Sequence, residues 1–334
     1  MLEKILRTGN ALIFALATFS LASGGCTQFS QLVRPANPVF CEKKHENYTQ
    51  KYCTVVHEQL DLEEVGLGAT ESDYEVLDDI MDRLIHRFKN RFGHWRAVLD
   101  FSRTIPLPQE ARVINFFKTI DNFLLDEGIQ NGHNYLINSA LKKEEKEFSC
   151  IKALIYLAIA ELNNLPLTLV MVRNHLLVRW NFSDSRHINW DVTNREEITR
   201  DNYRERIKDG YYIDKYRIHE DSIKNGVYLR NLTKEEVLGV VIYSNIGVAL
   251  CKKDEWDRGI EFFNKSLRLN PKNPVVLLNT GAAWLKKGNP YKAVWYFNET
   301  LRLDPNYSKA RKARDFALKR IKSLASARLT LNNK

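Results

Sequence analysis

The fold of this chain is indicated first by residues 149–167, which read SCIKALIYLAIAELNNLPL. Apolar side chains occupy nearly every position from Ile151 to Leu162, so the pattern predicts a helix that is buried on all sides. Asn163-Asn164 closes this helix, because asparagine tolerates the left-handed backbone of a C-terminal cap. Pro166 then prevents the helix from continuing.

Three strand-forming runs follow this helix, at Leu167–Val172, His175–Trp180 and His187–Thr193. Before it, apolar spacing predicts a helix at Ser72–Phe92, where Ser72 is a candidate N-cap and Glu75 completes a capping box. A second helix is expected after Pro106 and Pro108, ending near Gly128, and a third at Tyr135–Lys146. One buried helix on antiparallel strands gives an α+β core. We therefore expect an α+β domain over residues 71–232.

Cys150 stands at the predicted start of the buried helix, with Ser149 as its natural N-cap. A thiol at a helix N-terminus lies near the positive end of the macrodipole, which lowers its pKa and favours the nucleophilic thiolate. The alternative is a small apolar side chain that fills space at the helix start.

His175 begins the second predicted strand and Asp191 lies in the third. If the hairpin between them is centred on Ser183, the two residues lie directly opposite each other on one face. A carboxylate there would fix the imidazole tautomer and stabilise the imidazolium, as in a catalytic triad. The alternative is a chance polar pair on an exposed sheet face.

These residues together resemble the nucleophile helix and following strands of the transglutaminase-like (papain-like cysteine) superfamily, over about residues 110–205. In that family a cysteine, a histidine and an aspartate follow in this order. The resemblance implies that Cys150 is the nucleophile, His175 the acid and base, and Asp191 the residue that orients it. It implies acyl transfer or hydrolysis of amide bonds in peptides or proteins.

Residues 233–324 show a repeat. Segments 240–273 and 274–307 align at a period of 34, and Leu267–Pro271 (LRLNP) returns as Leu301–Pro305 (LRLDP). This period and punctuation are those of the tetratricopeptide repeat, a stack of helix pairs. Lys309–Leu324 is expected to cap the stack, with a basic tail at residues 325–334, and Cys251 is expected to pack within the first repeat.

The N-terminus has the order of a secretory leader: two basic residues, an apolar run at Ala11–Ala22, then small residues. Ser23–Cys26 resembles a bacterial lipobox. We therefore expect residues 1–25 to be a signal peptide and Cys26 to be acylated, anchoring the chain to a bacterial membrane in the cell envelope, facing the periplasm or the outside. Plain cleavage, or a buried N-terminal helix, is the alternative.

Residues 26–70 are polar and irregular and are interpreted as a linker. Within it, Cys41 and Cys53 are disulfide candidates in an oxidising compartment, the alternative being two free thiols.

The net charge of +9 is concentrated at the C-terminus, where residues 308–334 carry nine basic residues and one acid. We therefore expect no nucleic-acid partner. No histidine has metal-ligand spacing with cysteines or acids and no phosphate-binding loop is present, so we expect no metal and no cofactor. Two functions remain: a cysteine-dependent acyltransferase or hydrolase, or a non-catalytic envelope scaffold that binds a protein partner through its repeats.

Overall fold

The computed structural model describes residues 40–44, 47–92, 109–131, 136–141, 146–148, 151–192 and 208–332. Residues 37–334 form one compact unit. The predicted leader, the lipidation candidate Cys26 and the nucleophile candidate Cys150 lie outside the described residues.

The N-terminal half contains short strands and five helices among its described residues. These are β1 (Phe40–Lys44), β2 (Thr49–Tyr52), α1 (Val55–Glu64), α2 (Glu71–Phe92), α4 (Gln109–Asp126), β3 (Ile129–Asn131), α5 (Ile137–Leu141), β4 (Lys146–Phe148) and α6 (Ile151–Asn163). Strands β1 and β2 pair antiparallel, and β3 and β4 pair parallel.

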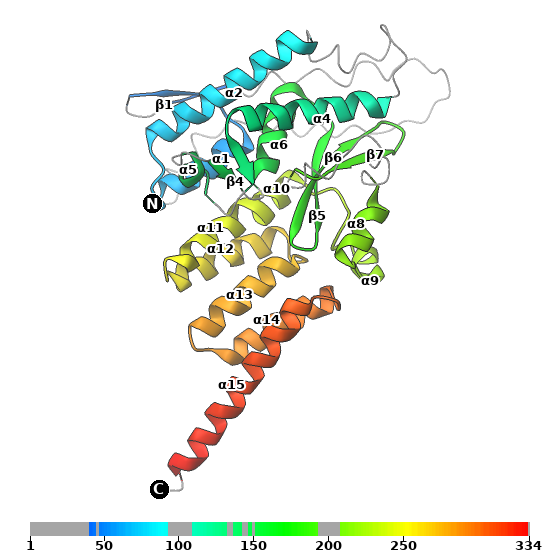
Figure 1. The fold of residues 1–334 in the computed structure, drawn as a ribbon. Coiled ribbons are helices and arrows are strands. Elements are labelled where there is room, and N and C mark those ends of the chain that lie inside the picture. Colours follow the sequence, from blue (N-terminus) through cyan, green and yellow to red (C-terminus); the bar gives the residue numbers. More distant parts are fainter. Residues whose placement is uncertain are drawn as a thin grey trace, which may run out of the picture. The chain divides into compact units, whose positions relative to one another are not determined.

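A three-stranded antiparallel sheet follows α6, in the order β5–β6–β7 (Figure 1). Its strands are β5 (Leu167–Val172), β6 (His175–Asn181) and β7 (His187–Trp190). The prediction of one buried helix followed by antiparallel strands is confirmed. The predicted left-handed cap is also present, since Asn164 has a φ of 52°.

The linker prediction for residues 26–70 is wrong for its described second half. Residues 40–64 form β1, β2 and α1, and α1 buries Val55, Val56 and Leu60. The same helix also buries polar side chains such as His57 and Glu63, and these obscured its apolar face in the sequence. The start of α2 differs too: Asp73 accepts hydrogen bonds from Thr70 N and Oγ1 at 2.7 and 3.0 Å, so the cap lies two residues before Ser72.

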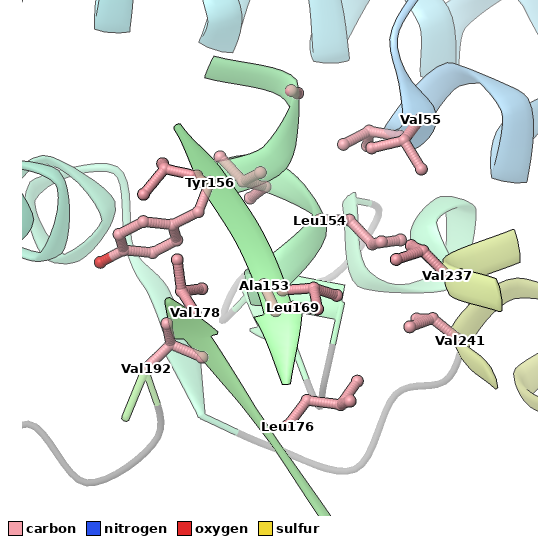
Figure 2. Close-up of a cluster of buried hydrophobic side chains, with 14 of the residues drawn as sticks. Val55, Ala153, Leu154, Tyr156, Leu169, Leu176, Val178, Val192, Val237 and Val241 are labelled. Carbon is pink, nitrogen blue, oxygen red and sulfur yellow. The ribbon is translucent and has the colours of Figure 1, made fainter. Parts of the chain in front are cut away.

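The main core joins segments that are far apart in sequence. Figure 2 shows Val55 of α1, Leu154 of α6 and Leu169 of β5 in one cluster with Val237, which precedes the first repeat, and Val241, at the start of that repeat. The start of the helical region is therefore not separated from the sheet by a flexible linker. Its first residues pack into the same hydrophobic core as the buried helix α6.

The C-terminal region is entirely helical from Lys234 to Asn332, apart from short connections. After α8 (Asp209–Tyr216) and α9 (Glu220–Lys224) come α10 (Lys234–Val237), the π-helical segment η2 (Leu238–Tyr243), α11 (Ser244–Lys252), α12 (Trp256–Leu269), α13 (Pro274–Lys286), α14 (Pro290–Leu303) and α15 (Ser308–Asn332). Figure 1 shows α11 to α15 following one another as packed neighbours.

The repeat period seen in the sequence is reproduced by the helices themselves. Helices α12 and α14 begin and end one repeat period apart, and the same holds for the ends of α11 and α13. A Cβ on Gly247 would lie 2.5 Å from Phe263, and one on Gly281 would lie 2.6 Å from Phe297. Both repeats thus need glycine at the helix crossing, because the aromatic ring of the partner helix occupies the space of a side chain.

The C-terminal helix α15 continues beyond the expected cap, through most of the predicted basic tail. Its residues 318–326 are mostly exposed. In the described part of the chain, no helix combines the length and apolar character needed to cross a membrane.

Glu63 provides a test of the N-terminal packing. Its fully buried carboxylate accepts the backbone N–H groups of Ile137 and Asn138, at 2.7 and 2.8 Å, where α5 begins. Burial raises the pKa of Glu63 to about 7, although these hydrogen bonds and one from Gln59 oppose the rise.

The first prediction concerns pH. The unfolded glutamate loses its proton near pH 4.5 and the folded one near pH 7, so the free energy of unfolding should fall as pH rises between these values, by up to about 3 kcal/mol. Urea unfolding of the protein and of Glu63→Gln at several pH values measures this. In Glu63→Gln, the free energy of unfolding should no longer fall with pH in this range. In Glu58→Gln, a change on the same helix, it should still fall as in the unmodified protein. Equal slopes in the protein and in Glu63→Gln would contradict the assignment.

Candidate functional site

His175 and Asp191 form a close pair at one end of the sheet, where β6 begins and β7 stops. His175 is the first residue of β6, and Asp191 directly follows β7. The imidazole Nε2 lies 2.7 Å from Asp191 Oδ1, with the histidine side chain 14% exposed and the aspartate side chain 4% exposed. The expected contact between the two side chains is therefore present, and the aspartate is sheltered from water.

The strand register behind this contact differs from the predicted one. Val178 pairs with Trp190 and Asn181 with His187, so the hairpin is centred on Asp184 rather than on Ser183. The turn explains the shift: Ser185 has a φ of 67°, and Phe182 N donates to Arg186 O at 2.9 Å. In this register Asp191 is diagonal to His175.

His175 and Asp191 nevertheless share one face, as predicted, but it is not the face that α6 covers: Tyr156 of α6 packs with Val178, whose side chain points to the face opposite that of His175 (Figure 2). Moving the hairpin centre by one residue moves each pairing partner by two, and side chains alternate with a period of two. His175 and Asp191 therefore still project from one face, and a diagonal pair remains within reach of long side chains.

Helix α8 supplies two further members of the site that the sequence analysis missed. The ring of Tyr216 stacks on His175, with 5.8 Å between centroids and 27° between planes. Lys215 Nζ lies 3.6 Å from Asp191 Oδ2. The signal in the sequence was the cluster of Tyr211, Tyr212, Lys215 and Tyr216, but nothing in its spacing linked it to the sheet.

The geometry determines which imidazole nitrogen faces the carboxylate. Asp191 engages Nε2, so proton transfer at His175 would run through Nδ1. His175 also lines a cavity of about 470 Å³, whose opposite wall includes Asn245, Asn279 and Lys309 of the helical region. A histidine that is held by a carboxylate at one nitrogen is oriented as a general acid or base must be.

The turn that leads into His175 is fixed to the second repeat by a buried ion pair. Arg173 donates to Asp304 from Nε at 2.6 Å and from Nη2 at 2.5 Å. Tyr228 also donates to Asp304, at 2.9 Å. Asn174, the other turn residue, has a φ of 58° and accepts a hydrogen bond from Tyr307. The side chains of Arg173 and Asp304 are 12% and 0% exposed.

This ion pair explains a difference between the two repeats. Asp304 occupies the position in the second repeat that Asn270 occupies in the first, and Asn270 is likewise buried. Only the second repeat meets the guanidinium of Arg173 among the described contacts, so only there does a carboxylate replace the amide.

Cys41, Cys53 and Cys251 lie in segments that the structure describes. Cys53 is disulfide-bonded; Cys41 lies in β1, and its side chain is outside the described residues. Cys251 is a free thiol, and burial raises its pKa to about 11. Its sulfur occupies the space over Gly259, which confirms the expected packing role.

A second histidine–aspartate pair provides a contrast. His57 Nε2 lies 3.1 Å from Asp78 Oδ1, and their side chains are 1% and 4% exposed. Burial raises the pKa of Asp78, but hydrogen bonds from His57, Tyr48 and the Lys51 backbone outweigh it, so the pKa falls. This pair is enclosed and ties α1 to α2. Within the described residues, no group of three or more histidine, cysteine or acidic side chains is placed to hold a metal ion.

The second prediction tests the ion pair at the turn. Asp304→Asn keeps the size of the side chain but leaves the buried Arg173 without its counter-charge, and this should lower the free energy of unfolding by about 3 kcal/mol. Urea or thermal unfolding measures the loss. Glu110→Gln removes the carboxylate of an exposed ion pair with Arg186, so it should cost less than about 1 kcal/mol. Equal losses in the two variants would show that the Arg173–Asp304 pair is no stronger than a surface pair.

Comparison with known proteins leaves the site to be interpreted from its own geometry. No protein-family model matches this sequence, and no curated protein matches it.

Proposed function

We propose that this chain is an exported, transglutaminase-like cysteine acyltransferase or amide hydrolase. Cys150 acts as nucleophile, His175 as general base and acid, and Asp191 as the residue that orients His175. The observation that carries the proposal is the hydrogen-bonded pair of His175 and Asp191, with a distance of 2.7 Å, beside a cavity.

The position of Cys150 in the sequence supports its role. It directly precedes α6, which begins at Ile151. The helix contacts both β5 and β6, on the face opposite that of His175, so the proposal requires the N-terminal end of α6 to bring Cys150 around the end of β6. A thiol at the N-terminal end of a helix experiences the positive end of the macrodipole, which favours the thiolate.

The reaction follows from these roles. Nδ1 of His175 takes the thiol proton of Cys150, and the sulfur attacks the carbonyl carbon of a substrate amide. The tetrahedral intermediate collapses as the C–N bond breaks, and the imidazolium returns its proton to the leaving amine. Water or a second amine then attacks the thioester, with His175 as base, and the thiolate leaves.

The surroundings of the pair support this cycle. Asp191 accepts from Nε2 throughout and stabilises the imidazolium. Lys215 lies near the other carboxylate oxygen, and Tyr216 covers one face of the ring. Both restrict the rotation of His175 and of Asp191, so less ordering is needed when substrate arrives.

The location of the protein is proposed from its N-terminus: a signal peptide at residues 1–25 and acylation of Cys26 would anchor the chain in the cell envelope. The disulfide at Cys53 supports an oxidising compartment. The repeats, with their regular period and glycine crossings, are proposed to be of the tetratricopeptide type.

The third prediction concerns thiol reactivity. Cys150 should react with an iodoacetamide probe well below the pKa of a free thiol, about 8.5, because the helix and His175 favour the thiolate. The measurement is the labelling rate against pH, with Cys150→Ala as blank. Cys251 should contribute little near neutral pH, since burial raises its pKa to about 11.

A matched pair of histidine variants serves as control. His175→Ala should move the pH midpoint of labelling upward and slow labelling near pH 6.5 by about tenfold or more. His187→Ala should not, although His187 lies on the same sheet and pairs with Asp209 at 3.2 Å. A Cys150 that is inert below pH 8.5, or that responds equally to both variants, would favour the non-catalytic scaffold.

The fourth prediction concerns export. The protein recovered from the producing cell's envelope should begin at Cys26, and it should be heavier than the bare polypeptide if that thiol is acylated. Intact mass spectrometry measures both features. A cytoplasmic protein that retains Met1 would refute export and, with it, the lipid anchor.

A further inference from the structure

We infer that one face of helix α15 binds the surface of an anionic lipid bilayer. This basic–apolar face consists of Lys312, Phe316, Lys319, Arg320 and Leu324, whose spacing of three and four residues places them on one side of the helix. All five residues are exposed. Binding of this kind goes beyond the proposed function, because it requires no enzymatic activity.

A different side of α15 packs on the repeats. Ala313 and Ala317 lie in one hydrophobic cluster with Ala293 and Phe297 of α14. Leu324 follows Ala317 by two helical turns, where α15 extends beyond α14 (Figure 1). Leu324 is 45% exposed, so no segment in the described part of the chain covers it.

Comparison with the preceding repeat shows what is unusual about this face. Lys312 and Lys319 stand one period of 34 residues after Leu278 and Leu285 of α13, which are half-buried in the cluster with Ala317. The last helix of a repeat stack has no following helix to cover it, so its outer surface is ordinarily polar. The two lysines follow this rule.

Phe316 breaks the rule. It stands one period after Ala282, and its ring is 57% exposed. A cap helix that only meets water would gain nothing from an exposed phenylalanine and leucine among its cations. Their exposure therefore indicates a partner that takes apolar side chains as well as positive charge.

The charge of α15 determines the sign of that partner. Residues 308–326 contain seven basic residues and one acid, Asp315. The ion pair that Asp315 makes is with Arg314, at 3.5 Å. Among the described residues, no carboxylate forms an ion pair with the cations of the basic–apolar face, so these cations remain available to an anionic partner.

An anionic bilayer surface satisfies both requirements. Its phosphate groups pair with lysine and arginine, whose long stems reach the headgroups while phenylalanine and leucine enter the boundary with the acyl chains. A nucleic acid would neutralise the cations but would leave Leu324 in water, since bases stack on aromatic rings and not on aliphatic side chains. The proposed lipid anchor would also place the chain beside such a surface.

The fifth prediction concerns vesicle binding. The protein is the chain from residue 26 onward with Cys26→Ser, which lacks leader and acyl chain but keeps the compact unit of residues 37–334. It should bind vesicles containing phosphatidylglycerol at least about tenfold more tightly than vesicles of phosphatidylcholine alone, because each cation near an anionic surface contributes about fivefold. Co-sedimentation measures both affinities, and the difference should shrink as salt is added.

One pair of variants tests the cations. Lys319→Glu with Arg320→Glu should weaken binding to anionic vesicles by about tenfold or more. Lys252→Glu with Lys253→Glu changes the net charge by the same amount at exposed residues where α11 ends, and should have little effect. Circular dichroism confirms that each variant is folded.

A second pair tests the apolar side chains at constant charge. Phe316→Ser with Leu324→Ser should also weaken binding by about tenfold or more, because two side chains no longer enter the bilayer. Leu125→Ser is the control: Leu125 lies on α4 and is 49% exposed, and its replacement should leave binding unchanged.

Each other outcome overturns the assignment. Equal binding to the two kinds of vesicle, or equal losses in the two charge variants, excludes this face as an anionic lipid site. Binding that survives Phe316→Ser with Leu324→Ser shows that no side chain enters the bilayer. Binding of a single-stranded oligonucleotide through Lys319 and Arg320, without binding to vesicles, assigns the cations to nucleic acid. None of these results bears on the reactivity of Cys150, so the proposed function stands or fails separately.

Discussion

The buried ion pair between Arg173 and Asp304 is the interaction on which the arrangement of this protein depends. It joins the turn before His175 to the end of the second repeat, and Tyr228 adds a hydrogen bond to the same carboxylate. Removing two charges from water offsets much of their attraction, so such a pair need not add net stability. Its effect is to select one placement, because any other would leave a buried charge without a partner.

Because the ion pair fixes the turn before His175, it also fixes where the His175–Asp191 pair lies relative to the helical region. His57 and Asp78 form another close histidine–aspartate pair among the described residues, yet that pair is enclosed while His175 lines a cavity. Hydrogen bonding alone therefore does not mark a reactive site. The distinction lies in access: a proton can be exchanged with a ligand only where the ring meets space that a ligand can enter.

The helical region has two roles in this interpretation. Its first two segments, α10 and η2, contribute Val237 and Val241 to the main core, and its later helices line the same cavity as His175. A repeat stack needs both of its ends covered. Here one end is covered by the sheet and by α1 and α6, and the other by α15.

The sequence by itself determined the elements whose signal is local: the buried helix 151–163, the left-handed Asn164, the first two strands of the sheet and the period of the C-terminal repeats. It also placed His175 and Asp191 on one face, because parity survives a shift of two residues. Tertiary structure decided the rest. The register of β6 and β7 followed from the turn at Ser185. Helix α1 was not predicted because its buried polar residues interrupt the apolar pattern. Tyr216 and Lys215 contact His175 and Asp191, and Asp304 contacts the turn before His175, from segments farther along the chain. Long-range contacts of this kind leave no periodic trace, since each depends on where two surfaces meet rather than on the spacing within either.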